Sequence, residues 1–321
     1  MGVDASMGQR VVAVVVAWNR QELLSETLAG LAAQNRPADA VVVIDNASTD
    51  GSAALAASHP VVTEVVGLPT NTGGAGGFAA GIARAVAHHD AELVWVMDDD
   101  TVPTPGALAA LLTARVRYPG RVTVAASRAD WRDGREHPMN RPRPRPGAGR
   151  VARGAAAMAE AYPIRSASFV SILIDAEAIR RHGLPEADYF LWNDDFEYTA
   201  RLLRNGVGLY VPASRVHHLT KVFGSSDADP GARFTNEVRN KLWVFTRSDA
   251  LGPADRTLYA GSTAVRWVRM LARSSDRAAL VAHGRRGLAQ GVRAPRPTVA
   301  VLAGTPVAED VLTIERGAGR A

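Results

Sequence analysis

Residues 93–100 read Leu93-Val94-Trp95-Val96-Met97-Asp98-Asp99-Asp100. A short apolar run that ends abruptly in three carboxylates is typical of a buried strand whose carboxyl end faces a ligand site. Similar apolar runs occur at 11–17, 40–45 and 61–66, with longer segments of helical period between them. This alternation predicts an α/β fold in which parallel strands are joined by crossover helices.

The rest of the chain up to about residue 250 continues the same pattern. Leu23, Leu24, Leu28 and Leu31 have helical spacing, so one side of that helix is expected to face the sheet. Four more helices are predicted: one at 79–87, one that begins at Thr104-Pro105, one that ends near residue 182, and one at 197–205. Further strands are predicted at 122–127, 168–175 and 207–211, and the last of these is expected to end at Pro212.

Length and composition limit the domain organisation and the chemistry. With 321 residues, 47% of them hydrophobic, the chain can bury one large core or a main domain with an appendage. We expect a catalytic domain at 1–250 and a helical extension at 251–321. The absence of cysteine excludes disulfides, thiolate metal sites and a cysteine nucleophile. Any metal must therefore be held by carboxylates or imidazoles.

The extension is basic and amphipathic. Residues 261–295 hold seven arginines and a single acid, Asp276, interleaved with apolar residues at helical spacing. This pattern fits attachment to an anionic membrane face, and it fits equally a helix packed on the catalytic domain with its arginines in solvent. The N-terminus has no apolar signal region, and no run is long enough to cross a bilayer. We expect a cytoplasmic protein, peripheral at the inner membrane face, that binds no nucleic acid.

Residues 131–150 are rich in Arg, Pro and Gly. Such a composition favours no packed element. We expect a mobile excursion over the site.

The acidic triplet predicts a cation site. In extended backbone, side chains two residues apart point the same way, so Asp98 and Asp100 can converge on one cation while Asp99 faces the other side. Mn²⁺ or Mg²⁺ takes oxygen ligands and commonly completes its shell with phosphate oxygens, which suggests a diphosphate substrate. The alternative is a solvated acidic turn.

Two further motifs lie at the same predicted edge. Asp45 and Asn46 end the second strand and can read the amide groups of a base, although an Asx turn explains them as well. Asn71 opens the glycine-rich run 71–77, which permits close approach to a phosphate or sugar. It is not a dinucleotide fingerprint, because that motif belongs in the first strand-to-helix turn, and 17–20 contains no glycine.

Three acids and a histidine pair complete the set. Asp194, Asp195 and Glu197 lie among aromatic residues, where a partly desolvated carboxylate can act as a general base, or they cap a helix. His217 and His218 offer an imidazole as a third ligand for Mn²⁺, although a histidine is often only a structural hydrogen-bonding group.

The order of these motifs resembles the family 2 glycosyltransferases of GT-A fold, over about residues 10–245. Within that family the glycine-rich run and the acidic triplet are most similar to actinobacterial galactofuranosyltransferases that act on a lipid-linked galactan precursor. The resemblance implies a mixed, mostly parallel Rossmann-like sheet and inverting transfer from a UDP-sugar. In that scheme Asp98, Asp100 and His218 hold the cation, and Asp195 is the general base.

The resemblance also assigns the substrate contacts. The base motif has an asparagine between Trp192 and the acids, so the choice between Asp194 and Asp195 stays open, as does that between His217 and His218. The resemblance implies donor contacts at Arg20, Asp45, Asn46, Asn71, Gly73, Gly74 and Asp99, and a sugar or acceptor pocket lined by Trp192, Asp194 and Glu197.

The leading hypothesis is transfer of galactofuranose from UDP-galactofuranose to a polyprenyl-diphosphate-linked glycan. A rhamnosyltransferase or another hexosyltransferase that uses a dTDP- or UDP-sugar is the alternative within the same chemistry. From other classes, an NDP-sugar nucleotidyltransferase would need a glycine-rich basic loop after its first strand, which 17–20 does not offer. A non-catalytic sugar- or lipid-binding relative would leave the acids and histidine without a purpose.

Overall fold

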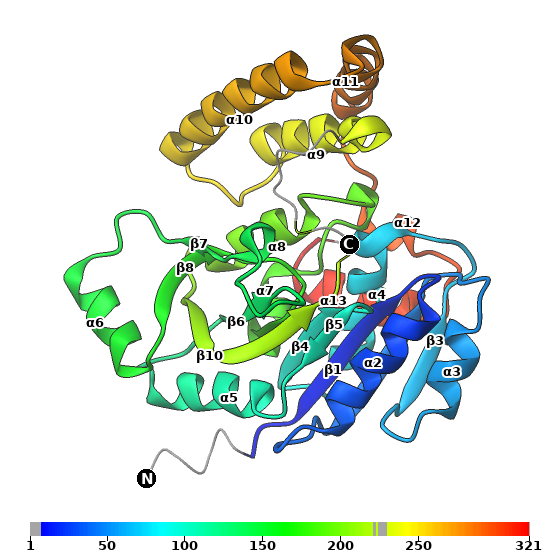
Figure 1. The fold of residues 1–321 in the computed structure, drawn as a ribbon, viewed down its shortest axis with the longest axis vertical. Coiled ribbons are helices and arrows are strands. Elements are labelled where there is room, and N and C mark those ends of the chain that lie inside the picture. The colour runs from blue at the N-terminus through cyan, green and yellow to red at the C-terminus, as the bar shows by residue number, and fades with distance from the viewer. Residues whose placement is uncertain (1–7, 221–222, 224–229, 321) are drawn as a thin grey trace.

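The chain forms one mixed sheet flanked by helices (Figure 1). The computed structural model describes residues 8–220, 223 and 230–320. The strand order is β3-β2-β1-β4-β9-β6-β10-β8-β7, and β5 pairs with β10. The strands are β1 (Val11–Ala17), β2 (Ala40–Asp45), β3 (Glu64–Gly67), β4 (Leu93–Asp98), β5 (Thr101–Pro103), β6 (Val124–Asp130), β7 (Arg143–Pro144), β8 (Tyr162–Ser166), β9 (Ile172–Asp175) and β10 (Gly208–His218).

Most strands run in one direction. β1 pairs in parallel with β2 and β4, β2 with β3, and β6 with β10, whereas β9 is antiparallel to both of its neighbours. The carboxyl ends of β2, β1 and β4 therefore meet at one edge of the sheet, which is where the acidic triplet was expected. The prediction of a mixed, mostly parallel α/β sheet is confirmed.

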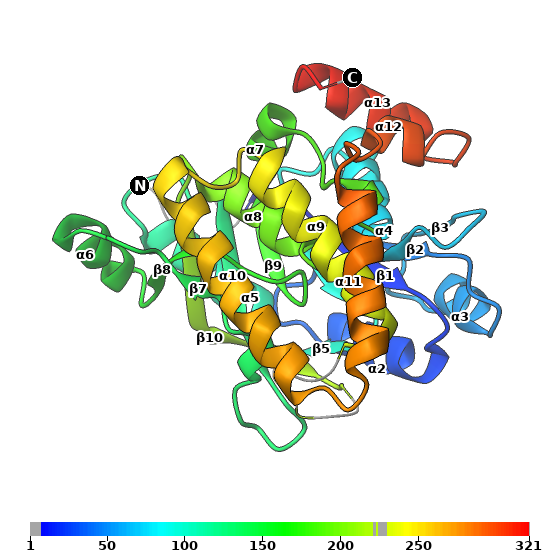
Figure 2. The same ribbon diagram turned by 90° about the horizontal axis from the view of Figure 1, so that it is seen from above.

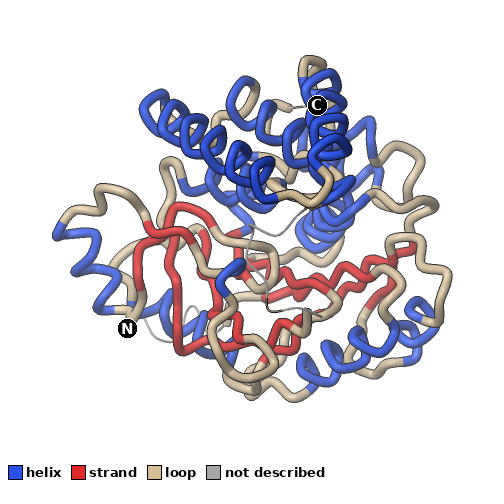
Figure 3. Tube along the Cα trace, turned by 45° about the horizontal axis from the view of Figure 1, so that its top comes forward, coloured by secondary structure: helices blue, strands red, loops and turns tan. Residues whose placement is uncertain are grey.

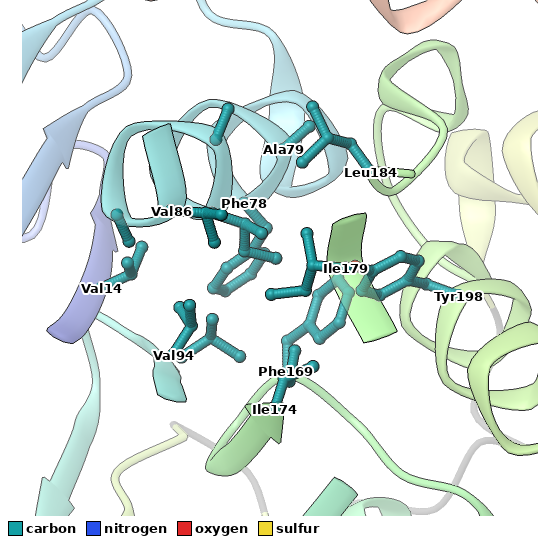
Figure 4. Close-up of a cluster of buried hydrophobic side chains, with 14 of the residues drawn as sticks. Val14, Phe78, Ala79, Val86, Val94, Phe169, Ile174, Ile179, Leu184 and Tyr198 are labelled. Carbon is teal, nitrogen blue, oxygen red and sulfur yellow. The ribbon is translucent and has the colours of Figure 1, made fainter. Parts of the chain in front are cut away.

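Helices cover both faces. The helices of the sheet region are α2 (Gln21–Ala32), α3 (Ser52–Ser58), α4 (Gly73–Ala87), α5 (Ala107–Arg117), α6 (Arg150–Met158), α7 (Ala176–His182) and α8 (Asp194–Leu203). Alternate residues of β1 point to opposite sides: Val12 and Val14 pack with α4, α7 and α8, whereas Val11, Ala13 and Val15 pack with α2 and α5. Figure 4 shows the first of these two cores, where the rings of Phe78 and Phe169 lie 4.6 Å apart between centroids.

A separate group of helices lies above the sheet, as Figures 2 and 3 show. α9 packs against α11, and Phe234, Val238, Met270 and Leu280 form its core. The chain then returns, so that the last helix packs on α4 and α7. These C-terminal helices are α9 (Phe234–Thr246), α10 (Pro253–Arg273), α11 (Arg277–Gly291), α12 (Thr298–Val301) and α13 (Ala308–Gly317).

Several element boundaries differ from the predictions. α4 begins at Gly73, so the glycines belong to the helix, and the strand predicted at 168–175 begins only at Ile172. The strand expected to close at Pro212 continues to His218, because a register irregularity between Val211 and Arg215 lets it pass the proline while paired to β6.

The prediction that residues 131–150 form no packed element is wrong. The segment contains the short 3-10 helix η1 (Pro138–Asn140) and β7, and His137 is completely buried. Long-range contacts replace the missing local preference, since Arg145 donates to the carbonyl oxygens of Leu203 and Gly206 at 3.2 and 2.9 Å. The segment does reach the site, as described below.

The basic helix divides its apolar residues between two environments. Met270 and Leu280 are buried against α9, whereas Leu258, Val265 and Val268 on α10 are exposed. In the part of the chain that the structure describes, no helix combines the length and apolar character needed to span a bilayer.

Candidate functional site

The acidic triplet and His218 meet where β4, β5 and β10 come together. β4 ends at Asp98, the chain turns through Asp99 and Asp100, and β5 pairs with β10 so that Thr101 faces His218. The amide of Leu219 donates to the carbonyl oxygen of Asp100 at 2.9 Å. Backbone pairing, rather than an extended strand through the triplet, therefore brings the imidazole to the acids.

Asp98, Asp100 and His218 present ligand atoms within 4.8 Å of one another. Oδ1 of Asp100 is buried, lies 3.1 Å from Nε2 of His218, and has no well-directed hydrogen bond among the described residues. Two carboxylates and an imidazole form a donor set that suits Mn²⁺. The geometry fits the predicted cation site, and it selects His218 over His217, which points to the other side of β10.

Arg20 supplies the opposing charge. Its Nη1 donates to Oδ1 of Asp99 at 3.1 Å and to Oδ2 of Asp100 at 2.6 Å. Asp99 also accepts the amide hydrogen of Trp18 at 2.9 Å. Arg20 therefore bridges Asp99 and Asp100, while Asp99 is not among the clustered ligand atoms and Oδ1 of Asp100 is left without this contact.

Burial and mutual repulsion shift the proton affinities of the triplet. Burial and the charge of Asp100 raise the pKa of Asp98 to about 7. Burial raises the pKa of Asp99 to about 6 against the opposing charge of Arg20. For Asp100, burial is outweighed by His218 and Arg20, which lower its pKa. A bound dication would relieve this repulsion, which is a physical reason for placing one here.

Asn140 orients the imidazole. Nδ1 of His218 lies 2.9 Å from Oδ1 of Asn140, an acceptor, so Nδ1 donates and Nε2 is the ring nitrogen that faces Asp100. This contact comes from the Arg- and Pro-rich segment, 78 residues away in sequence. The neighbouring His137 stacks near the same ring, with 5.5 Å between centroids.

We expect Asn140→Ala to weaken Mn²⁺ binding about 10- to 100-fold, because partners that orient a ligating histidine typically contribute that much to metal affinity. Titration calorimetry of the whole chain measures it. Asn140→Asp, which keeps an acceptor for the Nδ1 hydrogen, is the matched control and should retain most of the affinity. An unchanged affinity in Asn140→Ala would remove this role from Asn140.

A cavity of about 340 Å³ joins the cation site to the second acidic cluster. Asp98 and His218 line one side of it, and Asp194 and Asp195 the other. Of the predicted residues, Gly74, Asp98, Trp192, Asp194, Asp195 and His218 line the cavity, together with Met139, Asn140, Arg143, Glu237, Arg266 and Met270, which the sequence did not single out.

The two adjacent acids differ in environment. Burial raises the pKa of Asp194 well above its ordinary value, and the charge of Asp195 adds to the shift. Burial also raises the pKa of Asp195, but the amide hydrogen of Phe196 and the charges of Arg143 and Lys241 oppose it. Lys241 is itself buried, which lowers its pKa to about 8. Asp195 is thus the acid that more readily ionises.

A strained loop presents these acids. Phe190, Trp192 and Asn193 have φ values of 62°, 70° and 66°, which non-glycine residues adopt at a cost. The side-chain amide of the fully buried Asn240 donates to the carbonyl oxygens of this loop, among them that of Trp192 at 2.7 Å. Asn193 donates to Glu237 at 2.7 Å. Helix α9 therefore fixes the loop that carries the acids.

Glu197 does not line the cavity, which corrects its predicted place in the sugar or acceptor pocket. It is 1% exposed and accepts from Nε of Arg201 at 2.8 Å and from the hydroxyl of Ser248 at 2.7 Å. At helical spacing Glu197, two positions after Asp195, turns away from the cavity and into the core. Its function is a buried ion pair.

We expect Glu197→Gln to lower the free energy of unfolding by roughly 3–5 kcal/mol, since it leaves the charge of Arg201 buried without its hydrogen-bonded counter-ion. Denaturant unfolding at pH 7 measures the loss. Burial opposes ionisation of Glu197, but Arg201 outweighs it and lowers the pKa. The pair therefore stabilises the protein above the unfolded pKa, and the wild type should approach the variant as pH falls through the lowered pKa. Equal stability at pH 7 would contradict the argument.

The predicted donor residues occupy the neighbouring strand ends. Oδ1 of Asp45 is buried and has no hydrogen bond among the described residues, and Oδ2 accepts the amide hydrogen of Ser48 at 3.3 Å. Asn46 is already engaged: it accepts from the amide of Thr72 at 2.8 Å and donates to the carbonyl oxygen of Gly73 at 2.9 Å. Its visible task is to hold the start of α4, so Asp45 is the better placed of the two for reading a base.

The glycine-rich run shapes the cavity wall. Asn71 accepts the amide hydrogen of Gly73 at 2.7 Å, and Gly73 has a φ of 71°. A Cβ at Gly73 would lie 2.0 Å from the carbonyl oxygen of Phe190, whereas one at Gly74 would meet nothing within 4 Å. Gly73 therefore serves the packing of α4 on the acidic loop, and Gly74 leaves open space where α4 meets the cavity.

The site residues that could not be identified from the sequence share one property. Asn140, Arg143, Asn240 and Lys241 act through contacts distant in sequence, and none belongs to a local motif. The only signal was indirect, because a buried site with five acids requires cationic and amide partners from elsewhere.

Comparison with known proteins gives relatives over most of the chain. Galactofuranosyltransferase GlfT1 of Mycobacterium tuberculosis (strain H37Rv) is 30% identical over 263 residues, which cover 75% of this chain and 84% of that protein. S. aureus TarS 1–349 in complex with UDP-GlcNAc superimposes with a TM-score of 0.61 at 14% identity, covering 96% of this chain and 89% of the TarS 1–349 chain.

The mannosyltransferase PcManGT from Pyrobaculum calidifontis, solved in complex with GDP-Man and Mn²⁺, superimposes with a TM-score of 0.51 at 19% identity, over 97% of this chain and 87% of that one. These two likenesses support the GT-A fold. Residues 9–246 match the family described as "Glycosyltransferase like family 2". The chain therefore belongs to glycosyltransferase family 2 and is a glycosyltransferase.

Proposed function

We propose that this enzyme transfers galactofuranose, with inversion, from UDP-galactofuranose to a hydroxyl of a lipid-linked glycan. The observation that carries the chemistry is the cluster of Asp98, Asp100 and His218, of which Asp98 and His218 line the same cavity as Asp195. The 30% identity to galactofuranosyltransferase GlfT1 over 75% of the chain supports the sugar. The process served is cell-wall or surface polysaccharide synthesis.

Asp98, Asp100 and His218 hold a divalent cation, Mn²⁺ or Mg²⁺, which when bound supplies positive charge to the departing diphosphate. Arg20 and Asp99 keep the acidic turn in place. Asp45 accepts an N–H of uracil with its unpartnered oxygen. Asn46, Asn71, Gly73 and Gly74 shape the donor side, chiefly by setting the start of α4.

Asp195 accepts the proton of the acceptor hydroxyl. Its Oδ1 is occupied by the amide hydrogen of Phe196 at 2.6 Å, so Oδ2 is the basic atom. The acceptor oxygen bonds to the anomeric carbon as the bond from that carbon to the diphosphate breaks, and the electron pair leaves with UDP. Trp192 and Asp194 line the same cavity as the sugar or acceptor wall.

Donor screening tests the proposal. The whole chain is incubated with Mn²⁺, a rhamnose-containing disaccharide acceptor and either UDP-galactofuranose or dTDP-rhamnose, and release of UDP or dTDP is measured. We expect turnover of UDP-galactofuranose that EDTA abolishes and Mn²⁺ restores. Turnover of dTDP-rhamnose alone would assign a rhamnosyltransferase instead, and turnover undiminished in EDTA would contradict the cation site.

The proposal also concerns where the enzyme works. Exposed apolar residues on α10, namely Leu258, Val265 and Val268, lie among arginines that have no acidic neighbours in their own helix beyond its first turn. Such a surface suits peripheral contact with the inner face of the membrane, where a lipid-linked acceptor would reside. In this view 1–250 is the catalytic unit and 251–321 its basic extension.

A further inference from the structure

A second cavity, of about 210 Å³, adjoins the catalytic one. Among the described residues it is lined by Arg266, Arg269, Met270 and Arg273 of α10. Arg266 and Met270 also line the catalytic cavity, so the two spaces share a wall. In Figures 1 and 2, α10 lies above the half of the sheet that contains β7, β8 and β10.

The arginines of this second cavity are not equivalent. Arg266 forms an ion pair with Glu237, which also accepts from Asn193 beside the catalytic acids. Arg269 and Arg273 are exposed, and neither has an ion pair or hydrogen bond among the described residues. Arg266, Arg269 and Arg273 are spaced i, i+3 and i+7, so they share one side of α10.

We propose that Arg269 and Arg273, with Arg266 as the inner wall, bind the diphosphate of the acceptor. Guanidinium groups pair with phosphoryl oxygens through two parallel hydrogen bonds, and two unpaired arginines one turn apart supply four such donors toward one anion. Because the cavity adjoins the catalytic one, a diphosphate held here places the sugar attached to it toward Asp195. The inference rests on the proposed lipid-diphosphate acceptor.

The residues around this cavity distinguish it from a non-specific, positively charged surface. Glu237 pairs with Arg266, so among the described residues that line the cavity the uncompensated positive charge is carried by Arg269 and Arg273. Met270 gives the cavity an apolar floor, on which the first carbons of a prenyl chain can rest. Exposed Val265 and Val268 continue an apolar surface along the same helix.

Binding of a short, water-soluble prenyl diphosphate tests the subsite without sugar transfer. Calorimetry with geranyl diphosphate is done in EDTA, so that the cation site cannot bind the diphosphate. We compare the wild type, Arg269→Gln/Arg273→Gln, and Arg285→Gln/Arg286→Gln, which removes two exposed charges from α11 outside both cavities. The first double variant should bind about 10- to 100-fold more weakly, and the second within about twofold of the wild type.

Equal binding by the first double variant, or equal losses in both, would overturn the subsite. Sedimentation with phosphatidylglycerol vesicles separates the two sources of phosphate: a variant that loses vesicles but keeps geranyl diphosphate would assign the arginines to the bilayer instead and would also overturn it. If the arginines bind the diphosphate but galactofuranose is never transferred, the proposed sugar is wrong and the subsite stands.

A comparison of KM values tests whether the subsite can be wrong while the proposed function is right. The wild type should show a lower KM for a disaccharide on a short prenyl diphosphate than for the same disaccharide on a neutral alkyl chain. The Arg269→Gln/Arg273→Gln variant should bring the two KM values close together. Galactofuranose transfer in which both proteins show the same KM ratio would uphold the proposed function and reject the subsite.

Discussion

Asp195→Asn is expected to lower the turnover of sugar transfer at least about a hundredfold, the usual lower limit of a general-base contribution. Asparagine keeps the size of the side chain and an acceptor for the Phe196 amide, but it cannot take up a proton. Release of UDP at saturating donor and acceptor, with thermal unfolding to confirm matched folding, measures the effect. The donor KM should change little, because the cation ligands are untouched.

Asp194→Asn is the matched control for this experiment. Burial raises the pKa of Asp194 well above its ordinary value, which favours the uncharged acid, and an amide has the same shape as that form. We expect a loss below about tenfold. A larger loss from Asp194→Asn than from Asp195→Asn would contradict this assignment and identify Asp194 as the general base.

The central sheet was predictable because its strands carry their own signal. β1, β2 and β4 are buried on both faces, so they read as continuous apolar runs, and the crossover helices between them have amphipathic spacing. β9 was placed less well. It is inserted antiparallel between β4 and β6, and this pairing joins residues far apart in the chain, which no local pattern encodes.

The site residues likewise include some that local sequence predicts and some that it does not. Asp98 and Asp100 could be proposed as ligands because their charges interrupt an apolar strand, and His218 because a cation with two carboxylates needs another ligand. The structure brings the ligand atoms of these three residues within 4.8 Å of one another. Asn140 could not, since it lies in a segment whose composition predicts no structure, and only its contact with His218 shows its role. Glu197 was misplaced because helix-capping, catalytic and ion-pairing acids look alike in sequence.

Asp98→Asn is expected to remove the stabilisation of the protein by Mn²⁺ and, at the same time, to stabilise the metal-free protein. A cation that binds only the folded chain raises the unfolding midpoint with its concentration, and the variant should no longer show this response. Without metal, Asp98 is a carboxylate beside Asp100 in a largely desolvated place. Removing the charge should raise the unfolding midpoint in EDTA by about 2–4 °C for each ~1 kcal/mol of relieved repulsion.

The raised pKa of Asp98 predicts how stability in EDTA and the affinity for Mn²⁺ change with pH. Because the folded pKa of Asp98 is raised from 3.8 to about 7, the folded chain binds one proton more than the unfolded chain between these values. In EDTA the wild type should therefore lose stability as pH rises from about 4 to 7, and its gap to Asp98→Asn should widen over the same range. Mn²⁺ competes with that proton, so its affinity for the wild type should increase through pH 7. A wild type whose Mn²⁺ affinity is flat between pH 6 and 8, or a metal-free variant less stable than wild type at pH 8, would place the cation, or the charge repulsion, somewhere other than Asp98.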